Sequence, residues 1–306
     1  MTRGAWTKLG IHGSNTALIT PFKGGKVDAQ GFSRFVDWQI AEGTNGLVPV
    51  GTTGETPTLS HDEHMQVVDL CIKAAKKRVP VIAGAGSNST DEAIMLTRFA
   101  KQAGADAVLH STGYYNKPTQ EGLYLHFKAI SDAVDIPIIV YNVPGRAVVD
   151  ISAQTFARMC ELKNVAGIKD ATSNMQRQSQ HRELLGDKYI ALTGEDATAL
   201  GFMAHGGHGA ISVTSNVAPK LCAEFQATCA RGDYKTALRQ HDTLMPLHDA
   251  LFVETNPAPV KYAAWRLGII ESPECRLPLA PLSEMAMKAV DAALIASGVM
   301  SKQAAE

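Results

Sequence analysis

The sequence predicts an α/β fold, a (β/α)8 TIM barrel with a C-terminal helical extension. Three observations lead to this prediction. Eight short, continuous apolar runs alternate with longer amphipathic segments, as expected for parallel strands that are covered on both faces. No GxGxxG phosphate loop is present, which disfavours the alternative of an open doubly wound sheet. After the eighth run about 90 residues remain, more than a single barrel helix requires.

The eight apolar runs are expected to form the strands of the barrel. In chain order they are residues 17–19, 46–50, 79–83, 106–109, 137–141, 165–168, 189–192 and 209–213. If these strands close on themselves, the sheet has no exposed edge.

Helix signals lie between the predicted strands. Ser60 with Glu63, and Ser89 with Glu92, have the spacing of a capping box, in which each side chain bonds to the backbone amide of the other residue. Further N-caps are expected at Thr119 and Ser152, and helix ends near Gly43, Gly104 and Gly186.

The C-terminal part of the chain shows helical patterns without a linker. They lie around residues 220–231, 234–247, 257–267 and 282–297. We therefore expect residues 1–225 to form the barrel with the active site. Residues 226–306 are expected to form a helical appendage that packs on the barrel.

Composition narrows the class of protein. The 306 residues have a formal net charge of -1, which offers no basic field for nucleic acid or for a membrane surface. No apolar run reaches the roughly 20 residues that span a bilayer, and the first residues contain no signal-peptide core. The five cysteines are scattered and form no CxxC, which is typical of reduced thiols. We expect a cytoplasmic protein with small-molecule partners, without nucleic-acid or membrane partners.

A lone lysine, Lys169, follows the sixth apolar run and is the candidate nucleophile. Lysine is seldom fully buried unless it is paired or functional. Burial favours the neutral form of an amine, which can condense with a ketone to form a Schiff base. The alternative is a surface lysine that begins a loop. Asp170, the next residue, either pairs with Lys169 or faces solvent.

Polar residues follow several predicted strands, at the end where (β/α)8 barrels place their active sites. Thr52 and Thr53 lie between glycines, where amides and hydroxyls can hold a carboxylate. The phenol of Tyr141 can pass a proton, and Arg146 is a fork donor suited to a carboxylate. With an amine, these are the parts of a Schiff-base enzyme that acts on a 2-oxo acid. The alternatives are an ordinary turn, a core tyrosine and a surface arginine.

One histidine-rich segment, His61-Asp62-Glu63-His64, has the composition of a metal site. It lacks the HExxH spacing and falls in the first turn of a predicted helix. We expect no metal.

In combination, five motifs resemble the dihydrodipicolinate synthase family, within the N-acetylneuraminate lyase group of class I aldolase barrels. They are residues 51–55 (GTTGE), 114–118 (YYNKP), 141–146 (YNVPGR), 167–169 (GIK) and 256–257 (NP). The resemblance runs from about Asn15 to Gly298. It implies a homotetramer, built as a dimer of tight dimers, that uses no cofactor besides a covalent imine with pyruvate.

The resemblance also implies a role for each site residue. Lys169 forms the imine, and Thr52, Tyr141 and Tyr115 form a proton relay. In the family, Tyr115 reaches into the site of a neighbouring subunit. The substrate-binding positions are Thr53 for the pyruvate carboxylate, Arg146 for the carboxylate of L-aspartate 4-semialdehyde, and the backbone at Gly194 and Ile211.

A regulatory site is implied as well. In family members that lysine inhibits, L-lysine binds at the tight-dimer interface. The matching positions are Thr56, Pro57, His61, His64, Asn88, Glu92 and Tyr114. Glu92 is expected to take the lysine ammonium and Asn88 its carboxylate, whereas Thr56 and Pro57 depart from the commonest small pair.

The expected activity is the condensation of pyruvate with L-aspartate 4-semialdehyde in the lysine (diaminopimelate) biosynthetic pathway. One alternative is a related pyruvate-dependent aldolase that acts on a sugar-derived or hydroxylated 2-oxo acid. Another is a non-catalytic barrel that binds a 2-oxo acid. Arg146 favours the first, because an aldehyde that bears a carboxylate needs such a partner.

Overall fold

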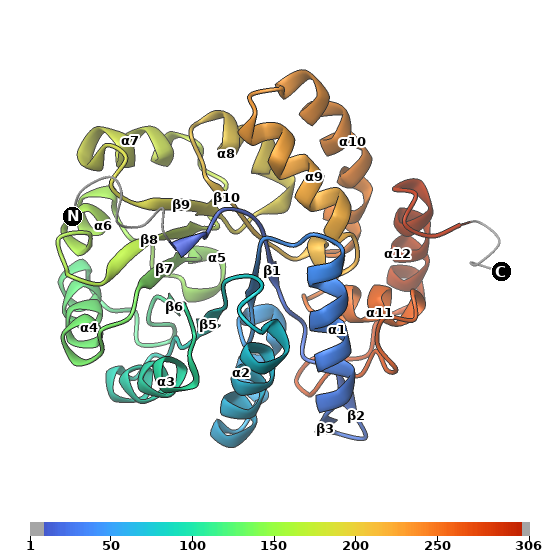
Figure 1. Cartoon of the computed structure of the whole chain (residues 1–306), viewed down its shortest axis with the longest axis horizontal. Coiled ribbons are helices and arrows are strands. Elements are labelled where there is room, and N and C mark those ends of the chain that lie inside the picture. The colour runs from blue at the N-terminus through green and yellow to red at the C-terminus, as the bar shows by residue number, and fades with distance from the viewer. Residues whose placement is uncertain (1–8, 302–306) are drawn as a thin grey trace.

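A computed structural model describes residues 9–301, and the predicted TIM barrel is confirmed (Figure 1). The barrel strands are β1 (Gly13–Ala17), β4 (Gly46–Val48), β5 (Ile82–Gly84), β6 (Ala107–Ser111), β7 (Ile138–Asn142), β8 (Val165–Asp170), β9 (Ile190–Thr193) and β10 (Gly209–Ser212). Their spatial order is β4-β1-β10-β9-β8-β7-β6-β5, all parallel. A parallel bridge between Leu47 and Val81 joins the two ends of the sheet. The prediction about the first residues lies outside the described range, as do the last five residues of the predicted appendage.

The first strand lies earlier in the chain than the predicted run 17–19. Its middle residues are polar but fully buried, so the apolar pattern does not mark them. Asn15 Nδ2 donates to the Ala210 carbonyl at 3.1 Å, and Thr16 Oγ1 donates to Gln39 Oε1 at 2.8 Å. These hydrogen bonds offset the cost of burying polar groups in a strand.

A small hairpin follows β1 and was not predicted. Strands β2 (Phe22–Lys23) and β3 (Lys26–Val27) pair antiparallel. Gly24 and Gly25 join them with φ of 58° and 78°, a conformation that favours glycine at both positions of a two-residue turn.

Helices cover the outside of the barrel (Figure 1). They are α1 (Ala29–Ala41), α2 (His61–Ala75), α3 (Thr90–Ala103), α4 (Gln120–Ala133), α6 (Ala153–Met159), α7 (Gln176–Leu185), α8 (Ala199–Ala204) and α9 (Pro219–Ala230). The short α5 (Pro144–Ala147) follows β7 instead and lies at the end of the barrel, where its Ala147 joins the inner apolar cluster. The N-caps at Thr119 and Ser152 and the capping box of Ser60 are confirmed. Ser89 also caps its helix, but the second capping box is wrong, because the Glu92 side chain contacts His61 and Ser87 instead.

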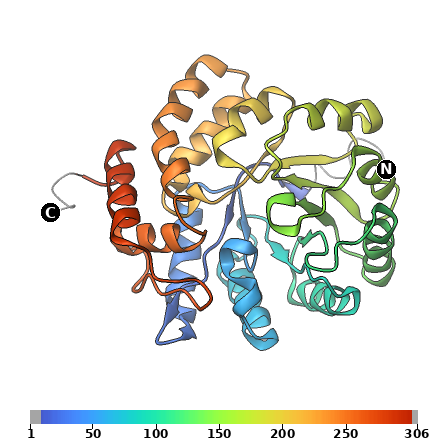
Figure 2. The same ribbon diagram turned by 180° about the vertical axis from the view of Figure 1, so that it is seen from behind.

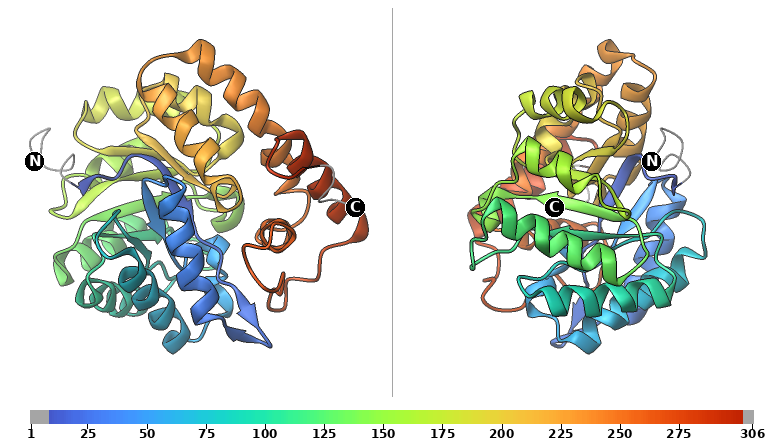
Figure 3. Two further views of the ribbon diagram at one scale, coloured as in Figure 1. Left: turned by 45° about the vertical axis from the view of Figure 1, so that its right-hand side comes forward. Right: turned by 90° about the vertical axis from the view of Figure 1, so that its left-hand side faces the viewer.

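The predicted C-terminal helices are confirmed as α10 (Tyr234–Ala250), α11 (Ala258–Arg266) and α12 (Glu284–Ala296). They gather on one side of the barrel, as the views from the front and from behind both show (Figures 1 and 2). The left-hand view of Figure 3 turns these helices toward the reader, and α10 packs on both α9 and α12. The boundary expected between residues 225 and 226 falls inside α9, and the division into two domains stays a prediction.

Two apolar clusters make up the core. The larger one combines strand residues with residues of the surrounding helices, such as Ile168 with Phe127 and Phe156, and lies between the sheet and the helices. The smaller one consists mainly of strand residues, among them Ile139, Tyr141 and Ile211, and fills the barrel. Within residues 9–301, no helix combines the length and the apolarity that crossing a membrane requires.

Candidate active site

Lys169 and Tyr141 lie next to each other on neighbouring strands. They are register partners in the pairing of β7 with β8, and Lys169 Nζ is 4.1 Å from the centroid of the Tyr141 ring. Both residues are buried, with exposed fractions of 6% and 7%. The strand continues through Lys169 and Asp170, so the lysine lies within the strand and not after it. The alternative of a surface lysine is therefore wrong.

A bulge in β8 decides which way Lys169 faces. Ile138 pairs with Val165 but Ile139 pairs with Gly167, so β8 holds one extra residue. Val165 belongs to the outer apolar cluster, and in a regular strand Lys169, four residues later, would share its face. The extra residue reverses this, and Lys169 joins Tyr141 on the inner face.

Gly194, after β9, packs closely against the side chain of Lys169. A Cβ atom at this position would lie 2.7 Å from Lys169 Cε and 2.9 Å from Ala171 Cβ. Such a contact is well inside normal van der Waals separation, so any side chain here displaces Lys169. The glycine is required for space, which is a different role from the backbone contact expected from the sequence.

We expect Gly194→Ala to lower kcat by about 100-fold while the protein still folds, because a displacement near 1 Å in an active site has this order of effect. Steady-state kinetics and thermal unfolding measure the two quantities. The matched control is Gly201→Ala in α8, where the new Cβ would meet only Met175, with Sδ at 3.4 Å. Equal activities of the two variants would contradict the steric role of Gly194.

The two threonines lie in a 3-10 turn, Thr52–Gly54, directly after β4. Thr53 is buried, and its Oγ1 accepts a hydrogen bond from Asn256 Nδ2 at 3.0 Å. The Gly54 carbonyl accepts one from Thr20 Oγ1 at 2.7 Å. The turn is therefore held from both sides, by the barrel and by the C-terminal region.

Glu55 anchors the same turn in a second way. Its side chain is 1% exposed and forms a 2.7 Å ion pair with Lys261 on α11, whose side chain is 0% exposed. The other carboxylate oxygen of Glu55 accepts from the Arg276 amide at 2.9 Å. Lys261 Nζ also lies 4.1 Å from the centroid of the Phe22 ring. The C-terminal region thus sets the position of the threonine turn.

A cavity of about 380 Å³ opens beside these residues. It brings together Thr52, Tyr141 and Arg146 of the predicted catalytic set with Thr56, Pro57, His61, His64, Glu92 and Tyr114 of the predicted lysine site. Lys169 adjoins it through the Tyr141 ring. Lys169 itself is not among the lining residues, and neither are Thr53, Gly194, Ile211 and Asn88. The two sites inferred separately from the sequence therefore share one cavity.

Tyr115 lies apart from the cavity of its own chain. Its exposed fraction is 92%, and its φ is +68°, in the left-handed region that is uncommon for a bulky residue. The role expected for it in a neighbouring subunit stays a prediction.

Glu92 and the two histidines form a polar cluster in the cavity wall. Hydrogen bonds from Ser87 and His61 lower the pKa of Glu92, and His61 Nε2 lies 2.6 Å from Glu92 Oε1. Burial lowers the pKa of His64, whose Nε2 hydrogen-bonds the Gly84 carbonyl at 2.9 Å. Within the part of the chain that the structure describes, no group of three or more histidine, cysteine or acidic side chains, this cluster included, is arranged to hold a metal ion.

Several residues of the cavity wall were not identified from the sequence. They are Gly84, Gly86, Ser111 and Thr112, at the ends of β5 and β6. The glycines in the GAG segment 84–86 are a signal that could have been used. A Cβ at Gly84 would lie 2.2 Å from the Val50 carbonyl oxygen, so the strand end can approach its neighbour only without a side chain.

Comparison with known proteins agrees with this geometry. The model of the Dihydrodipicolinate synthetase family matches residues 10–297. A 4-hydroxy-tetrahydrodipicolinate synthase of Parvibaculum lavamentivorans is 63% identical over 289 residues, which cover 94% of this chain and 99% of the relative.

Solved structures lead to the same family. The chloride-inhibited dihydrodipicolinate synthase of Acinetobacter baumannii, complexed with pyruvate, has a TM-score of 0.92 and 47% identity, covering 95% of this chain and 100% of its own. The DHDPS of Cyanidioschyzon merolae with lysine bound has a TM-score of 0.91 and 34% identity, covering 94% of this chain and 99% of its own. Because these matches extend over the barrel and its helical extension alike, the chain belongs to the dihydrodipicolinate synthetase family.

Proposed function

We propose that this chain catalyses the reaction for which its curated relatives are named, the 4-hydroxy-tetrahydrodipicolinate synthase reaction, in lysine (diaminopimelate) biosynthesis. The substrates are pyruvate and L-aspartate 4-semialdehyde. The observation that carries the proposal is the buried amine of Lys169 against the Tyr141 ring, beside a cavity that Thr52 and Arg146 also line. The membership of a lyase family and the 63% identity to a named synthase support it.

The proposed mechanism begins with attack of the Lys169 amine on the carbonyl carbon of pyruvate. Water leaves and an imine forms, with Tyr141, Thr52 and the partner subunit's tyrosine equivalent to Tyr115 passing the protons. Loss of a methyl proton gives an enamine, whose carbon attacks the aldehyde of the second substrate. Attack by the product's own amine on the imine carbon then closes the ring and releases Lys169. No redox or metal step is needed for this balance.

Substrate carboxylates would be held at two places. The amides and hydroxyls of Thr52 and Thr53 are proposed to bind the carboxylate of pyruvate, and Gly194 and Ile211 to lie along the same pocket. Arg146 is exposed on α5 and lines the cavity, so its guanidinium can meet the carboxylate of the semialdehyde.

A coupled assay with both substrates tests the proposal directly. We expect turnover with pyruvate plus L-aspartate 4-semialdehyde, and no pyruvate release from sialic acid or other hydroxylated 2-oxo acids. Release of pyruvate from hydroxylated 2-oxo acids without turnover of the semialdehyde would establish the alternative aldolase. No turnover with either set of substrates would indicate a barrel that binds a 2-oxo acid without catalysis.

We expect Arg146→Lys to raise the KM for the semialdehyde by about 10- to 100-fold, because an ammonium cannot reproduce the bidentate contact of a guanidinium. The KM for pyruvate should change by less than about threefold. Steady-state kinetics with each substrate varied in turn make the measurement. An equal rise of the KM for pyruvate and the KM for the semialdehyde would contradict the assignment of Arg146 to the semialdehyde carboxylate.

L-Lysine is proposed to inhibit this enzyme by binding at the tight-dimer interface, with its ammonium at Glu92 and its carboxylate at Asn88. Glu92 is held in its ionised form by His61 and Ser87. Asn88 lies nearby, with its Nδ2 donating to the Tyr114 carbonyl at 3.3 Å. The lysine-bound structure of the Cyanidioschyzon merolae protein supports the proposal by similarity.

Glu92→Gln is expected to raise the lysine concentration for half inhibition by about tenfold or more, because it removes the charge that pairs with the ammonium. Activity without lysine should stay close to that of the unmodified chain. Asp91→Asn, which neutralises the neighbouring carboxylate on α3, is the control and should leave inhibition unchanged. An inhibition curve for Glu92→Gln that matches the control would place lysine elsewhere.

We further propose a cytoplasmic homotetramer built as a dimer of tight dimers. The 92% exposure of Tyr115 supports a contact with another subunit, and the five free cysteines are compatible with a reducing compartment. Sedimentation of the purified chain tests the assembly, and a monomer with full activity would contradict it.

A further inference from the structure

The two strand residues that follow Lys169 and Tyr141 have a separate set of contacts. Asp170 follows Lys169 on β8, Asn142 follows Tyr141 on β7, and the two are register partners. Because side chains alternate along a strand, they face the helices while Lys169 and Tyr141 face the barrel interior. Asn142 is fully buried and Asp170 is 4% exposed. Asp170 therefore neither pairs with Lys169 nor faces solvent, contrary to both alternatives considered from the sequence.

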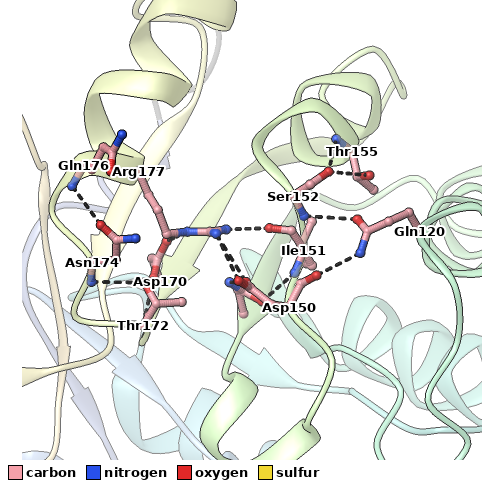
Figure 4. A network of polar contacts seen from close by, with 11 residues as sticks. Gln120, Asp150, Ile151, Ser152, Thr155, Asp170, Thr172, Asn174, Gln176 and Arg177 are labelled. Atoms are coloured by element: carbon pink, nitrogen blue, oxygen red, sulfur yellow. Dashed lines mark hydrogen bonds and ion pairs between the residues drawn. The ribbon is translucent and has the colours of Figure 1, made fainter.

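Arg177, near the start of α7, connects Asp170 on β8 with residues 150–151, which follow α5 (Figure 4). Its Nε donates to Asp170 Oδ2 at 2.9 Å, and its Nη1 lies 3.2 Å from Asp150 Oδ1. Its Nη2 donates to the Ile151 carbonyl at 2.5 Å. A single buried guanidinium thus contacts the strand that carries Lys169 and the segment that follows α5.

Asn142, on β7, contacts the same two residues, Asp150 and Ile151. Its Nδ2 donates to Asp150 Oδ1 at 2.7 Å, and its Oδ1 accepts from the Ile151 amide at 3.1 Å. These contacts tie together the two ends of residues 143–149, the loop that carries Arg146. We call Asn142, Asp150, Asp170 and Arg177 the Arg177 network.

Stability alone does not account for a network of this kind. Desolvating a guanidinium and a carboxylate offsets most of their attraction, so apolar residues of similar volume would serve packing as well. A guanidinium supplies fixed geometry, because its planar fork directs several donors at once along set directions. In Arg177, Nε donates to Asp170 on one side, and the two terminal nitrogens donate to Asp150 and Ile151 on the other.

Resting on the proposed function, we propose that Arg177 is a positioning residue, which holds the Arg146 loop at a fixed place relative to the strand that carries Lys169. It touches no substrate and acts through Asp150 and Asp170. Lys169 and Tyr141 remain aligned without it, because the backbone pairing of β7 with β8 already places them together.

The test is Arg177→Met, which keeps an unbranched apolar side chain like the aliphatic stem of arginine and removes the guanidinium fork. The KM for the semialdehyde is expected to rise about tenfold, since the Arg146 loop loses its fixed position. The KM for pyruvate and the extent of imine trapping by borohydride with pyruvate alone should stay within about twofold. A rise in both KM values, or in neither, would overturn the proposal.

A double-mutant cycle shows whether the effect passes through Arg146. In an Arg146→Ala background, Arg177→Met should change the semialdehyde KM by less than about twofold, because the group that it positions is gone. Arg177→Lys should lie between the unmodified chain and Arg177→Met. The control is Arg158→Met on α6, whose guanidinium pairs with the exposed Glu121 away from the network. Independent effects of the Arg146 and Arg177 substitutions would contradict the proposed coupling.

Two further measurements distinguish the proposed role of Arg177 from a loss of folding and from a failure of the proposed function. If Arg177→Met does not fold, Asp150→Asn changes the half-exposed end of the network, and the same selective rise of the semialdehyde KM is expected, about threefold. Hydrogen–deuterium exchange needs no turnover, and the variant should exchange faster at residues 143–151 but not in β8. A chain without synthase activity would reject the proposed function, while unchanged exchange in this loop would reject the role of Arg177.

Discussion

Lys169→Ala is expected to lower kcat by at least about 10³-fold, because it removes the amine that is proposed to form the covalent intermediate. Lys169 is the buried amine against the Tyr141 ring, and its side chain also packs closely on Gly194. Treatment with pyruvate and borohydride should leave a reduced pyruvate adduct on Lys169 in the unmodified chain and none in the variant. Peptide mass spectrometry makes this measurement.

The control for this prediction is Lys163→Ala. Lys163 lies just before the same strand, is largely exposed and pairs with Asp135 at 2.9 Å. Its removal should leave both the kinetics and the adduct unchanged. An adduct at Lys163, or full activity in Lys169→Ala, would end the Schiff-base assignment.

Lys261→Met is expected to destabilise the protein by about 3–5 kcal/mol, because it leaves the Glu55 carboxylate buried without a countercharge. The pair is 2.7 Å apart, and both side chains are at most 1% exposed. Thermal or urea unfolding measures the loss. Since Glu55 adjoins the Thr52–Gly54 turn, the KM for pyruvate should rise in the same variant.

A double variant separates lost charge balance from lost packing. Glu55→Gln combined with Lys261→Met removes both charges, so it should recover more than half of the stability that Lys261→Met loses. The matched surface control is Lys73→Met, whose partner Asp69 lies one helical turn away in an exposed ion pair and should contribute at most about 1 kcal/mol. If the double variant were as unstable as the single one, lost packing around Lys261 would account for the destabilisation instead.

Much of the barrel could be predicted because its signals are local. Continuous apolar runs predicted seven of the eight strands at nearly their observed positions, and Ser60, Thr119 and Ser152 cap helices through residues three positions away. The first strand was misplaced because its buried residues are polar and find their partners elsewhere in the fold. Glu92 had the spacing of a capping box but bonds Ser87 and His61 instead.

The candidate site was predictable to the extent that it follows strand ends. Thr52, Tyr141 and Arg146 could be placed on one face of the barrel, and they do line one cavity. Lys169 could be named but not oriented, since its direction depends on the bulge between Val165 and Gly167. A one-residue shift of this kind moves a side chain to the other face without a clear mark in the sequence.

The sequence by itself determined the order of the eight barrel strands and of the longer helices, and it identified the motifs and the family, because each of these depends on neighbouring residues or on their spacing. Tertiary structure decided how charges pair inside the protein. Glu55 meets Lys261 across 206 positions, and Asp170 meets Arg177 rather than its neighbour Lys169. A buried charge is stable only beside a partner. Neither the 206 positions between Glu55 and Lys261 nor the seven between Asp170 and Arg177 show in the sequence which partner that is, because the folded backbone brings the two groups of each pair together.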